Sequence, residues 1–411
     1  MCSPSARGLH ASPISEEIGP SNQRIRDSKS KSEIDNMHQS AVAAIEPPAL
    51  TIRKISAVRG IRVLSWDGDV LYGSRGYELL RWRAPSGPAR RASDHQWAAV
   101  AHFNPAWWRK LSSRRALSSR IARDGFHTLA VPGERDAGRR GKIGTNNCAL
   151  IAAVPGAIVT RTPGDEEFRV THQIHRGTRP LHIIAVPGGT VYWGEYFDNR
   201  DRAEVHIFAS DDGGESWHVA YTFRRGAIRH VHNIVYDRWQ DCLWILTGDN
   251  GNECKVARAS CDLRSVEVVL SGNQQARAAA AIPMPDALYL STDTPFEANH
   301  ILRFSRTGTV EQLASIPSSS IFGCRVGDAI FFSTMVEPSA VNRTREVRLM
   351  GSVDRRNWQL LASWQKDKWP LRYFQYGNAF LPEGENSTHY LAATTIAVEQ
   401  EDFVTTLWEV E

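Results

Sequence analysis

Apolar residues in this chain occur in short runs from Ile55 onward, and Gly, Pro, Asp and Asn interrupt them. Runs of this length between turn-forming residues predict many short β-strands. The runs also repeat: a strand with aromatic residues ends in a small residue and often an acid, and a second strand bearing Arg or Ser follows. Copies begin at Val70, Val191, Leu243, Leu288, Ile330 and Tyr390, and a weaker copy begins at Cys148.

The spacing of these copies indicates the architecture. If Trp193, Thr247, Ser291 and Ser333 are equivalent, successive copies lie 54, 44 and 42 residues apart. This is the length of one four-stranded blade, which buries both of its faces only when blades pack radially. We therefore predict an all-β fold, a β-propeller over residues 51–411, with seven blades and with six or eight as the alternatives. The strand near residues 61–65 is the candidate to complete the last blade and close the ring.

Two segments depart from this pattern. Residues 1–50 are rich in Ser, Pro and charged side chains, which predicts a disordered N-terminal segment. Near residues 105–125, apolar side chains recur at helical spacing among Arg and Lys, between Pro105 and Gly125. We expect a helical insertion between early blades there.

Composition and charge narrow the functional classes. The 411 residues carry a formal net charge of +4, which is small for this length, so a nucleic-acid partner is not expected. No stretch approaches the roughly 20 consecutive apolar residues of a membrane span. The N-terminus has no apolar signal-peptide core, so a cytoplasmic location is the default expectation. The six cysteines form no CxxC pair, which argues against a cysteine-based zinc site and a dense disulfide framework.

One turn motif is specific. Residues 210–217 read Ser-Asp-Asp-Gly-Gly-Glu-Ser-Trp and match S-x-D-x-G-x-[ST]-W at every fixed position. In such a turn Asp212 accepts backbone N–H bonds, Gly214 takes a left-handed conformation, and Trp217 fills the space between blade sheets. Residues 352–358 form a degraded second copy.

This motif and the repeat resemble the Asp-box propellers of the sialidase/BNR superfamily, and the resemblance in pattern covers residues 55–411. It implies the fold in the first place, because Asp-boxes lie on outer blade turns of sialidases, other glycosidases and non-enzymatic propellers alike. Sialidases proper also carry an early Arg-Ile-Pro motif, which this chain lacks, so sialidase activity itself is disfavoured.

Two Arg-x-x-His units point to a site. Arg179 and His182 form the first unit, and Arg229 and His232 form the second unit 50 residues later. Both units precede an apolar strand, so we expect them at one end of the propeller axis. Arginine can hold a carboxylate or phosphate, and histidine can transfer protons near neutral pH. His230 and His232 share one strand face, so they are also candidate ligands of a divalent metal ion.

Acids and other polar side chains at matching strand ends complete the predicted site. We assign catalytic roles to His182, His232, Glu195 and Asp249. We assign substrate-binding roles to Arg179, Arg229, Trp193, Tyr196, Asp293, Arg277, Gln375 and Tyr376. The purely structural alternative is that the Arg and His side chains bond to neighbouring backbone and that the acids cap turns.

These residues predict a carbohydrate-active propeller, a glycoside hydrolase or a polysaccharide lyase, that acts on an anionic oligo- or polysaccharide at the axial mouth. The alternative is a non-catalytic propeller that binds a glycan or a protein partner on the same face. The chain has no phosphate-binding Gly loop, no G-x-S-x-G motif and no HExxH motif, which argues against nucleotide enzymes, serine hydrolases of that type and zincin proteases.

Overall fold

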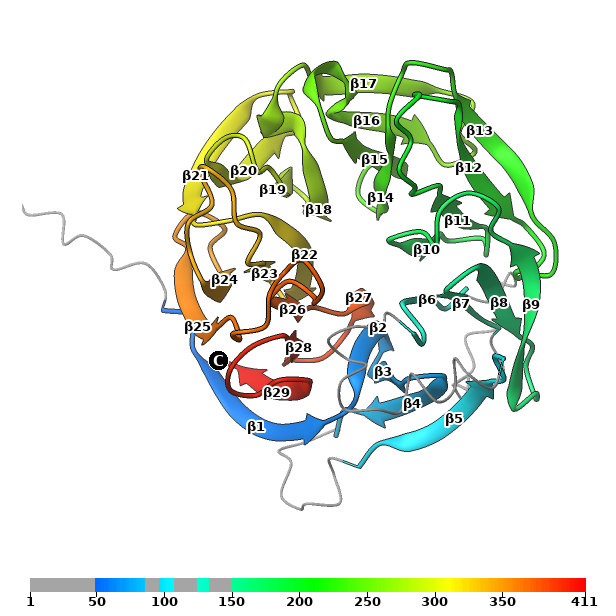
Figure 1. Ribbon diagram of the computed structural model, residues 1–411, viewed down its shortest axis with the longest axis horizontal. Coiled ribbons are helices and arrows are strands. Elements are labelled where there is room, and N and C mark those ends of the chain that lie inside the picture. The colour runs from blue at the N-terminus through cyan, green and yellow to red at the C-terminus, as the bar shows by residue number, and fades with distance from the viewer. Residues whose placement is uncertain (1–48, 86–95, 107–123, 133–148) are drawn as a thin grey trace, which may run out of the picture. The chain divides into compact units, whose positions relative to one another are not determined.

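The computed structural model describes residues 49–85, 96–106, 124–132 and 149–411. The strands within these residues form sheets arranged radially about a central axis (Figure 1). The predicted all-β propeller is therefore confirmed. The segment predicted to be disordered and most of the predicted helical insertion lie outside the described residues. Within the described ranges, no helix is long and apolar enough to cross a membrane.

In most blades the chain runs outward from the axis, and each strand pairs antiparallel with the next (Figure 1). The first blade contains β2 (Arg62–Gly68), β3 (Val70–Arg75), β4 (Glu78–Arg83) and β5 (Ala98–Phe103). The second contains β6 (Thr128–Ala130), β7 (Leu150–Val154), β8 (Ala157–Arg161) and β9 (Glu167–Gln173). The third contains β10 (Ile183–Ala185), β11 (Val191–Gly194), β12 (Val205–Ser210) and β13 (His218–Phe223).

The next three blades repeat the same order. The fourth contains β14 (His230–Asp237), β15 (Cys242–Gly248), β16 (Lys255–Ser260) and β17 (Val266–Ser271). The fifth contains β18 (Ala278–Pro283), β19 (Ala287–Thr292), β20 (Asn299–Ser305) and β21 (Val310–Ile316). The sixth contains β22 (Ser320–Val326), β23 (Ala329–Thr334), β24 (Glu346–Ser352) and β25 (Gln359–Gln365). Two short 3-10 turns, η2 (Gly251–Glu253) and η3 (Gln274–Ala276), lie in the connections of this part of the chain.

The closing blade takes strands from both ends of the described chain. β26 (Asn378–Phe380), β28 (Tyr390–Ile396) and β29 (Val404–Val410) supply three strands, and β1 (Ile52–Arg59) pairs antiparallel with β29. The prediction that residues 61–65 close the ring is wrong, because residues 62–65 lie in β2, the innermost strand of the first blade. Five blades are separate four-stranded sheets, whereas the first and second blades are joined edge to edge because β5 pairs in parallel with β9. With these two blades counted separately, the described strands form seven four-stranded groups, which is consistent with the seven blades predicted.

One additional strand lies outside this repeat. β27 (Glu383–Asn386) pairs in parallel with β2, with Ser65 opposite Glu383. The closing blade and the first blade are therefore joined near the axis as well as through β1. This pairing brings Glu383 into the central part of the ring, where it contacts the second and third blades.

The burial of the second strands explains the repeated apolar runs in the sequence. All residues of β15, β19 and β23 are buried, because both faces of these strands pack against neighbouring blades. A strand buried on both faces reads as a continuous apolar run. The outer strand β21 is only partly covered, and its exposed and covered residues alternate over most of its length.

The hairpin predicted at residues 210–217 is present between β12 and β13. Asp212 accepts N–H bonds from Glu215 and Ser216, both at 3.0 Å, and hydrogen bonds from the hydroxyls of Ser216 and Ser210. Partial burial raises the pKa of Asp212, but these bonds, above all the one from Ser216 Oγ, lower it to about 2. Gly214 has a φ of +88° and donates its N–H to Ser210 Oγ. The Trp217 ring packs edge-on against Trp193, with 6.3 Å between the ring centroids. Across the blade boundary, Thr160 Oγ1 donates to the Gly214 carbonyl at 2.8 Å, and Trp217 Nε1 donates to Thr171 Oγ1 at 3.3 Å. The turn therefore fastens the third blade to the second.

The same Ser-based turn recurs in other blades. Ser260, Ser305 and Ser352 each end the third strand of a blade, as Ser210 does. Ser260 Oγ accepts the N–H of Ser265, and Ser305 Oγ accepts the N–H of Thr309. A serine at the end of the third strand is thus part of the repeat, although only residues 210–217 match the full motif.

Candidate functional site

In each blade the innermost strand starts where the second strand ends, because the two strands are antiparallel. These starts and ends lie on one face of the ring, here called the axial mouth. In the fourth blade, His230 at the start of β14 pairs with Gly248 at the end of β15. In the fifth blade, Ala278 at the start of β18 pairs with Thr292 at the end of β19. Residues that begin an innermost strand and residues that follow a second strand therefore lie at the same end of the axis.

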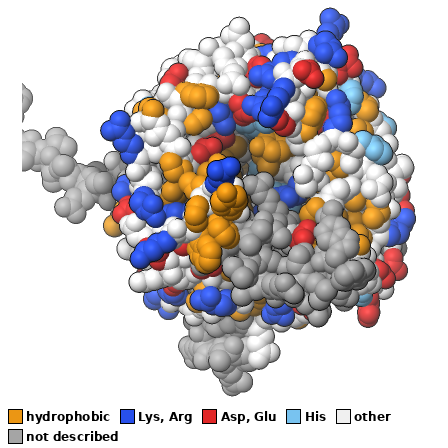
Figure 2. Space-filling model, in the orientation of Figure 1, with side chains coloured by type: hydrophobic (Ala, Val, Ile, Leu, Met, Phe, Trp, Pro, Cys, Tyr) orange, Lys and Arg blue, Asp and Glu red, His pale blue; other side chains and the backbone are white. Residues whose placement is uncertain are grey.

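A cavity of about 280 Å³ lies at the axial mouth, and described residues from every blade line it. In Figure 2, hydrophobic side chains and charges of both signs meet near the middle of the face in view. The cavity is close to the lower end of the usual range for small-molecule sites, about 300–1,000 Å³. It therefore suits a small ligand or the end of a longer one.

Three arginines contribute to the polar part of the cavity wall: Arg62, Arg179 and Arg277. Arg62 lies with its guanidinium carbon 4.0 Å from the Phe380 ring centroid, and its Nη1 is 3.0 Å from His127 Nδ1. Ile321, Phe322 and Phe380 add an apolar part from the sixth and closing blades. The cavity thus combines cationic side chains with apolar surface.

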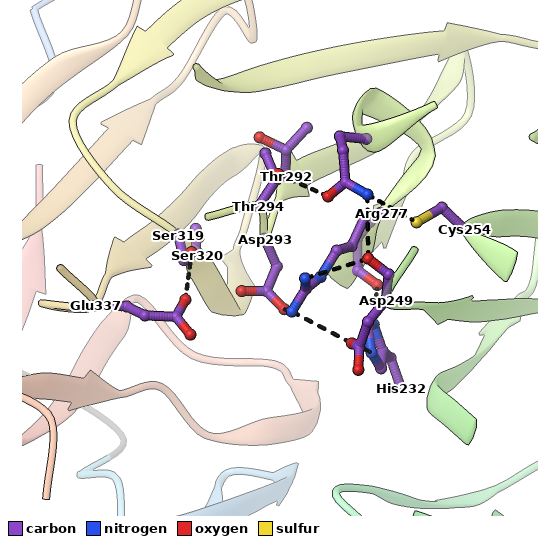
Figure 3. A network of polar contacts seen from close by, with 12 residues as sticks. His232, Asp249, Cys254, Arg277, Thr292, Asp293, Thr294, Ser319, Ser320 and Glu337 are labelled. Atoms are coloured by element: carbon purple, nitrogen blue, oxygen red, sulfur yellow. Dashed lines mark hydrogen bonds and ion pairs between the residues drawn. The ribbon is translucent and has the colours of Figure 1, made fainter. Parts of the chain in front are cut away.

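Arg277 lies between two carboxylates (Figure 3). Its Nη2 is 3.3 Å from Asp249 Oδ1 and 3.5 Å from Asp293 Oδ2. Burial raises the pKa of Asp293 to about 7; Arg277 lowers it, whereas the nearby charge of Glu337 raises it further. Glu337 in turn accepts a hydrogen bond from Ser319 Oγ at 2.8 Å. One carboxyl group at the axial mouth therefore titrates near neutral pH.

His230, His232 and Asp249 form a compact cluster beside Arg277. The Nε2 atoms of the two histidines are 3.2 Å apart. Asp249 Oδ1 lies 3.2 Å from Nε2 of His232 and 3.4 Å from Nε2 of His230. Burial opposes ionisation of Asp249, but its contacts with the two histidines hold its pKa below the usual range. Burial likewise lowers the pKa of His232, although contact with Asp249 opposes this.

His182 has a carboxylate partner that the sequence did not reveal. Its Nδ1 contacts Glu383 Oε1, and Thr128 Oγ1 donates a hydrogen bond of 2.9 Å to Glu383 Oε2. Glu383 comes from β27, 201 residues after His182. An imidazole held in this way by a carboxylate has a fixed orientation, and His182 also lines the cavity.

The structure brings most of the predicted residues together and separates others. The predicted residues that line the cavity are Arg179, His182, Tyr196, His232, Arg277, Asp293, Gln375 and Tyr376. Asp249 and His230 adjoin this wall through their contacts with His232. Asp249 also contacts Arg229, with 3.0 Å between Asp249 Oδ2 and Arg229 Nη1.

Three of the predicted roles do not fit the positions of the side chains. Trp193 is 2% exposed and stacks on Phe208 inside the blades, so it is not a sugar platform. Glu195 is buried, is ion-paired with Arg176 and accepts the N–H of His206, which is a structural role. The Arg229 guanidinium is held by Asp198 and Asp249, so its role at the mouth is to position Asp249.

Sequence reasoning also missed side chains at the mouth, notably Arg62, His127 and Glu383. Arg62 begins β2, and Arg277 immediately precedes β18, so the repeat itself could have placed Arg62 at the mouth. His127 precedes β6 in the same way. Glu383 lies in the additional strand β27, outside the repeat, and the sequence carried no signal for it.

Comparisons with known proteins support the fold. No protein-family model matches the sequence, and no curated protein matches it. The WD40 β-propeller domain of Doa1 is similar in structure, with a TM-score of 0.50 and 10% sequence identity over 88% of this chain and 97% of that one. The β-propeller domain of Cps50 (Swd1) from Myceliophteria thermophila has a TM-score of 0.51 and 10% identity over 88% of this chain and 100% of that one. At this identity the likeness shows a β-propeller, and it does not show the sialidase/BNR superfamily.

Proposed function

We propose that this propeller binds a carboxylate-bearing glycan in the cavity at its axial mouth, without a requirement for catalysis. The observation that carries the proposal is the presence of Arg62, Arg179 and Arg277, from three different blades, in one cavity of about 280 Å³. A guanidinium group presents a planar set of N–H donors that matches a carboxylate.

The remaining wall of the cavity is suited to a sugar rather than to an inorganic anion. Ile321 and Phe322, which are partly exposed, offer apolar surface for the C–H face of a sugar ring. Gln375 and Tyr376 add polar groups for hydroxyls, and the Tyr376 side chain is exposed. A ligand that is anionic at one end and amphipathic along its ring fits this combination.

Binding should be measured by calorimetry with uronate oligosaccharides and with neutral oligosaccharides of the same length. We expect the uronates to bind and the neutral sugars not to bind. Arg179→Ala should weaken binding by at least about tenfold, because a hydrogen bond to a charged group contributes about 1.5–3 kcal/mol. Arg224→Ala, at an exposed arginine that does not line the cavity, is the matched control. Equal affinity for charged and neutral sugars would contradict the proposal, and binding of neither would favour a protein partner.

A second candidate function is β-elimination of a uronic-acid glycoside, and the contact between His182 and Glu383 favours it. Glu383 holds Nδ1 of His182, so Nε2 is the nitrogen available to take the proton next to the uronate carboxyl group. The C–O bond to the departing sugar then breaks and a carbon–carbon double bond forms. Water protonates the departing oxygen, and the proton held on His182 neutralises the hydroxide that this leaves. An arginine on the carboxylate would stabilise the intermediate charge.

Ultraviolet absorbance of the unsaturated product separates the two candidates. If the protein is a lyase, absorbance rises with polyuronates, and His182→Gln stops the rise while calorimetric binding remains. If binding alone is the function, the uronates bind to the wild type and no product forms.

A further inference from the structure

Three acceptor atoms converge beside the axial cavity. They are Nε2 of His230, Nε2 of His232 and Oδ1 of Asp249, separated by 3.2, 3.2 and 3.4 Å. His230 and His232 are buried, and the exposed fraction of the Asp249 side chain is only 16%. The three atoms therefore face one another where bulk water does not screen them.

The other nitrogen of each imidazole determines where its proton lies. Nδ1 of His230 is 3.0 Å from the carbonyl oxygen of Phe197, and Nδ1 of His232 is 3.0 Å from that of Ala278. A carbonyl oxygen only accepts hydrogen bonds, so each Nδ1 carries the hydrogen and each neutral imidazole has a lone pair on Nε2. Two nitrogen lone pairs and a carboxylate oxygen then point at one another. This arrangement is repulsive unless a positive charge, either an additional proton or a metal ion, lies between them.

The dimensions of the triangle fit a metal ion. Zinc binds imidazole nitrogen at about 2.0–2.1 Å and carboxylate oxygen at about 2.0–2.2 Å in tetrahedral geometry, which separates neighbouring ligand atoms by about 3.3–3.5 Å. The three separations, 3.2, 3.2 and 3.4 Å, are close to this value. Histidine ligands of metal ions also commonly donate their other N–H to a backbone carbonyl, as both histidines do here.

The charged groups around Asp249 leave its Oδ1 atom as the oxygen that can bind the ion. Arg229 Nη1 lies 3.0 Å from Asp249 Oδ2, which directs Oδ1 toward the histidines. Arg277 also contacts Oδ1, at 3.3 Å, and its positive charge weakens the affinity for a cation. Asp198 and Asp293 pair with these two arginines and offset part of that charge. We therefore expect binding weaker than that of a structural zinc site.

We propose that His230, His232 and Asp249 bind a divalent transition-metal ion, with Zn²⁺ as the best match, and leave a fourth coordination position for water or a ligand. Two imidazoles and one carboxylate are a ligand set of the kind that catalytic zinc sites use, in which the fourth position is not taken by protein. His232 also lines the axial cavity, so the ion lies beside Arg277 and Asp293. This inference is independent of glycan binding, because the metal alone is the probe.

The experiment uses the chain of residues 1–411, purified without a histidine tag and treated with a chelator that is then removed. Calorimetry with Zn²⁺ alone should give one site per chain. Co²⁺ should give the visible absorption bands of a tetrahedral complex. His232→Gln and Asp249→Asn should each weaken Zn²⁺ binding by at least about 100-fold, because losing a ligand costs more than the about 10–100-fold cost of losing a group that only orients one. Each variant is first checked for folding by circular dichroism.

His218→Gln is the matched control, since His218 is exposed and lies outside the cluster. It should bind Zn²⁺ like the wild type. If His232→Gln or Asp249→Asn fails to fold, loss of the Co²⁺ bands in His230→Gln tests the same cluster. Failure of the wild type to bind Zn²⁺ at one site, or unchanged affinity in a folded His232→Gln, would overturn the proposal.

Discussion

Arg277 Nη2 lies 3.5 Å from Asp293 Oδ2, yet this ion pair does not keep Asp293 acidic. Burial raises the pKa of Asp293 to about 7 despite the arginine, and Glu337 adds to the shift. Arg277 is shared with Asp249, so its charge is not directed at Asp293 alone. The axial mouth therefore gains or loses one proton within the physiological range.

Asp293→Asn should change how stability depends on pH. The folded pKa of about 7 lies above the ordinary value of 3.8, so the wild type has a stability contribution that is complete below about pH 4 and is lost as pH rises through about 7. The variant lacks this contribution. Its free energy of unfolding relative to wild type should rise between about pH 4 and pH 8, by at most about 4 kcal/mol. Urea unfolding of both proteins across this range measures the effect, and parallel curves would contradict it.

Gly214→Ala should destabilise the protein more than Gly213→Ala. Both glycines have positive φ values, +88° and +76°, so both substitutions should cost about 1–2 kcal/mol in backbone strain. A Cβ at Gly214 would also lie 2.6 Å from Ile151 Cδ1, whereas the atom nearest to one at Gly213 is 3.9 Å away. We expect an additional loss of about 1–3 kcal/mol for Gly214→Ala, measured by chemical denaturation. Equal losses would show that the hairpin shifts away from the second blade at little cost.

Trp193 and Tyr376 should respond to substitution in opposite ways. Trp193→Ala should cost about 3–5 kcal/mol of stability, because the ring is 2% exposed and stacked on Phe208. Tyr376→Ala should change stability by less than about 1 kcal/mol and weaken uronate binding, because Tyr376 is exposed and lines the cavity. Thermal unfolding and calorimetry on the same samples test both statements. If the Trp193→Ala protein is stable but binds uronates weakly, then Trp193 belongs to the binding site and not to the core alone.

Removing β1 should disrupt ring closure. A chain that begins at residue 49 keeps β1, whereas a chain that begins at residue 60 leaves β29 paired with β28 alone and its other edge open. We expect the shorter protein to unfold at a lower temperature and to aggregate, because an unpaired edge strand invites pairing between chains. Thermal unfolding and light scattering of the two truncated proteins isolate the contribution of β1. Identical behaviour would show that the other three strands of the closing blade suffice.

The propeller fold could be predicted from the sequence because each blade has its own pattern over a short stretch of residues. Fully buried second strands such as β15 and β19 give continuous apolar runs that recur at blade spacing, and residues 210–217 match a specific turn motif. The closing strand was assigned wrongly because β1 and β2 are adjacent strands of similar length. Only the pairing partner distinguishes them, and pairing over such a distance leaves no local pattern.

Site residues could be predicted from the sequence only where they occupy equivalent positions in the repeated blades. Arg179, Arg277 and Asp293 occupy repeating positions, and the structure places them in one cavity. Trp193 and Tyr196 are both aromatic residues near the end of β11, yet one is buried between blades and the other lines the mouth. The direction of a side chain depends on the pleat and on neighbouring blades, which a single sequence does not give. Glu383 reaches His182 from 201 residues away, through a strand outside the repeat.

The pairing of β1 with β29 also has a consequence for protein synthesis. Ile52 pairs with Val410 and Arg59 with Val404, so the earliest described strand to leave the ribosome requires the last one as its partner. Domains commonly begin to fold while translation continues, but here the circle of blades cannot be completed until β29, residues 404–410, has emerged. Throughout elongation β1 lacks the partner that it has in the native ring. A chain that stops before residue 404 would therefore lack the strand with which β1 pairs.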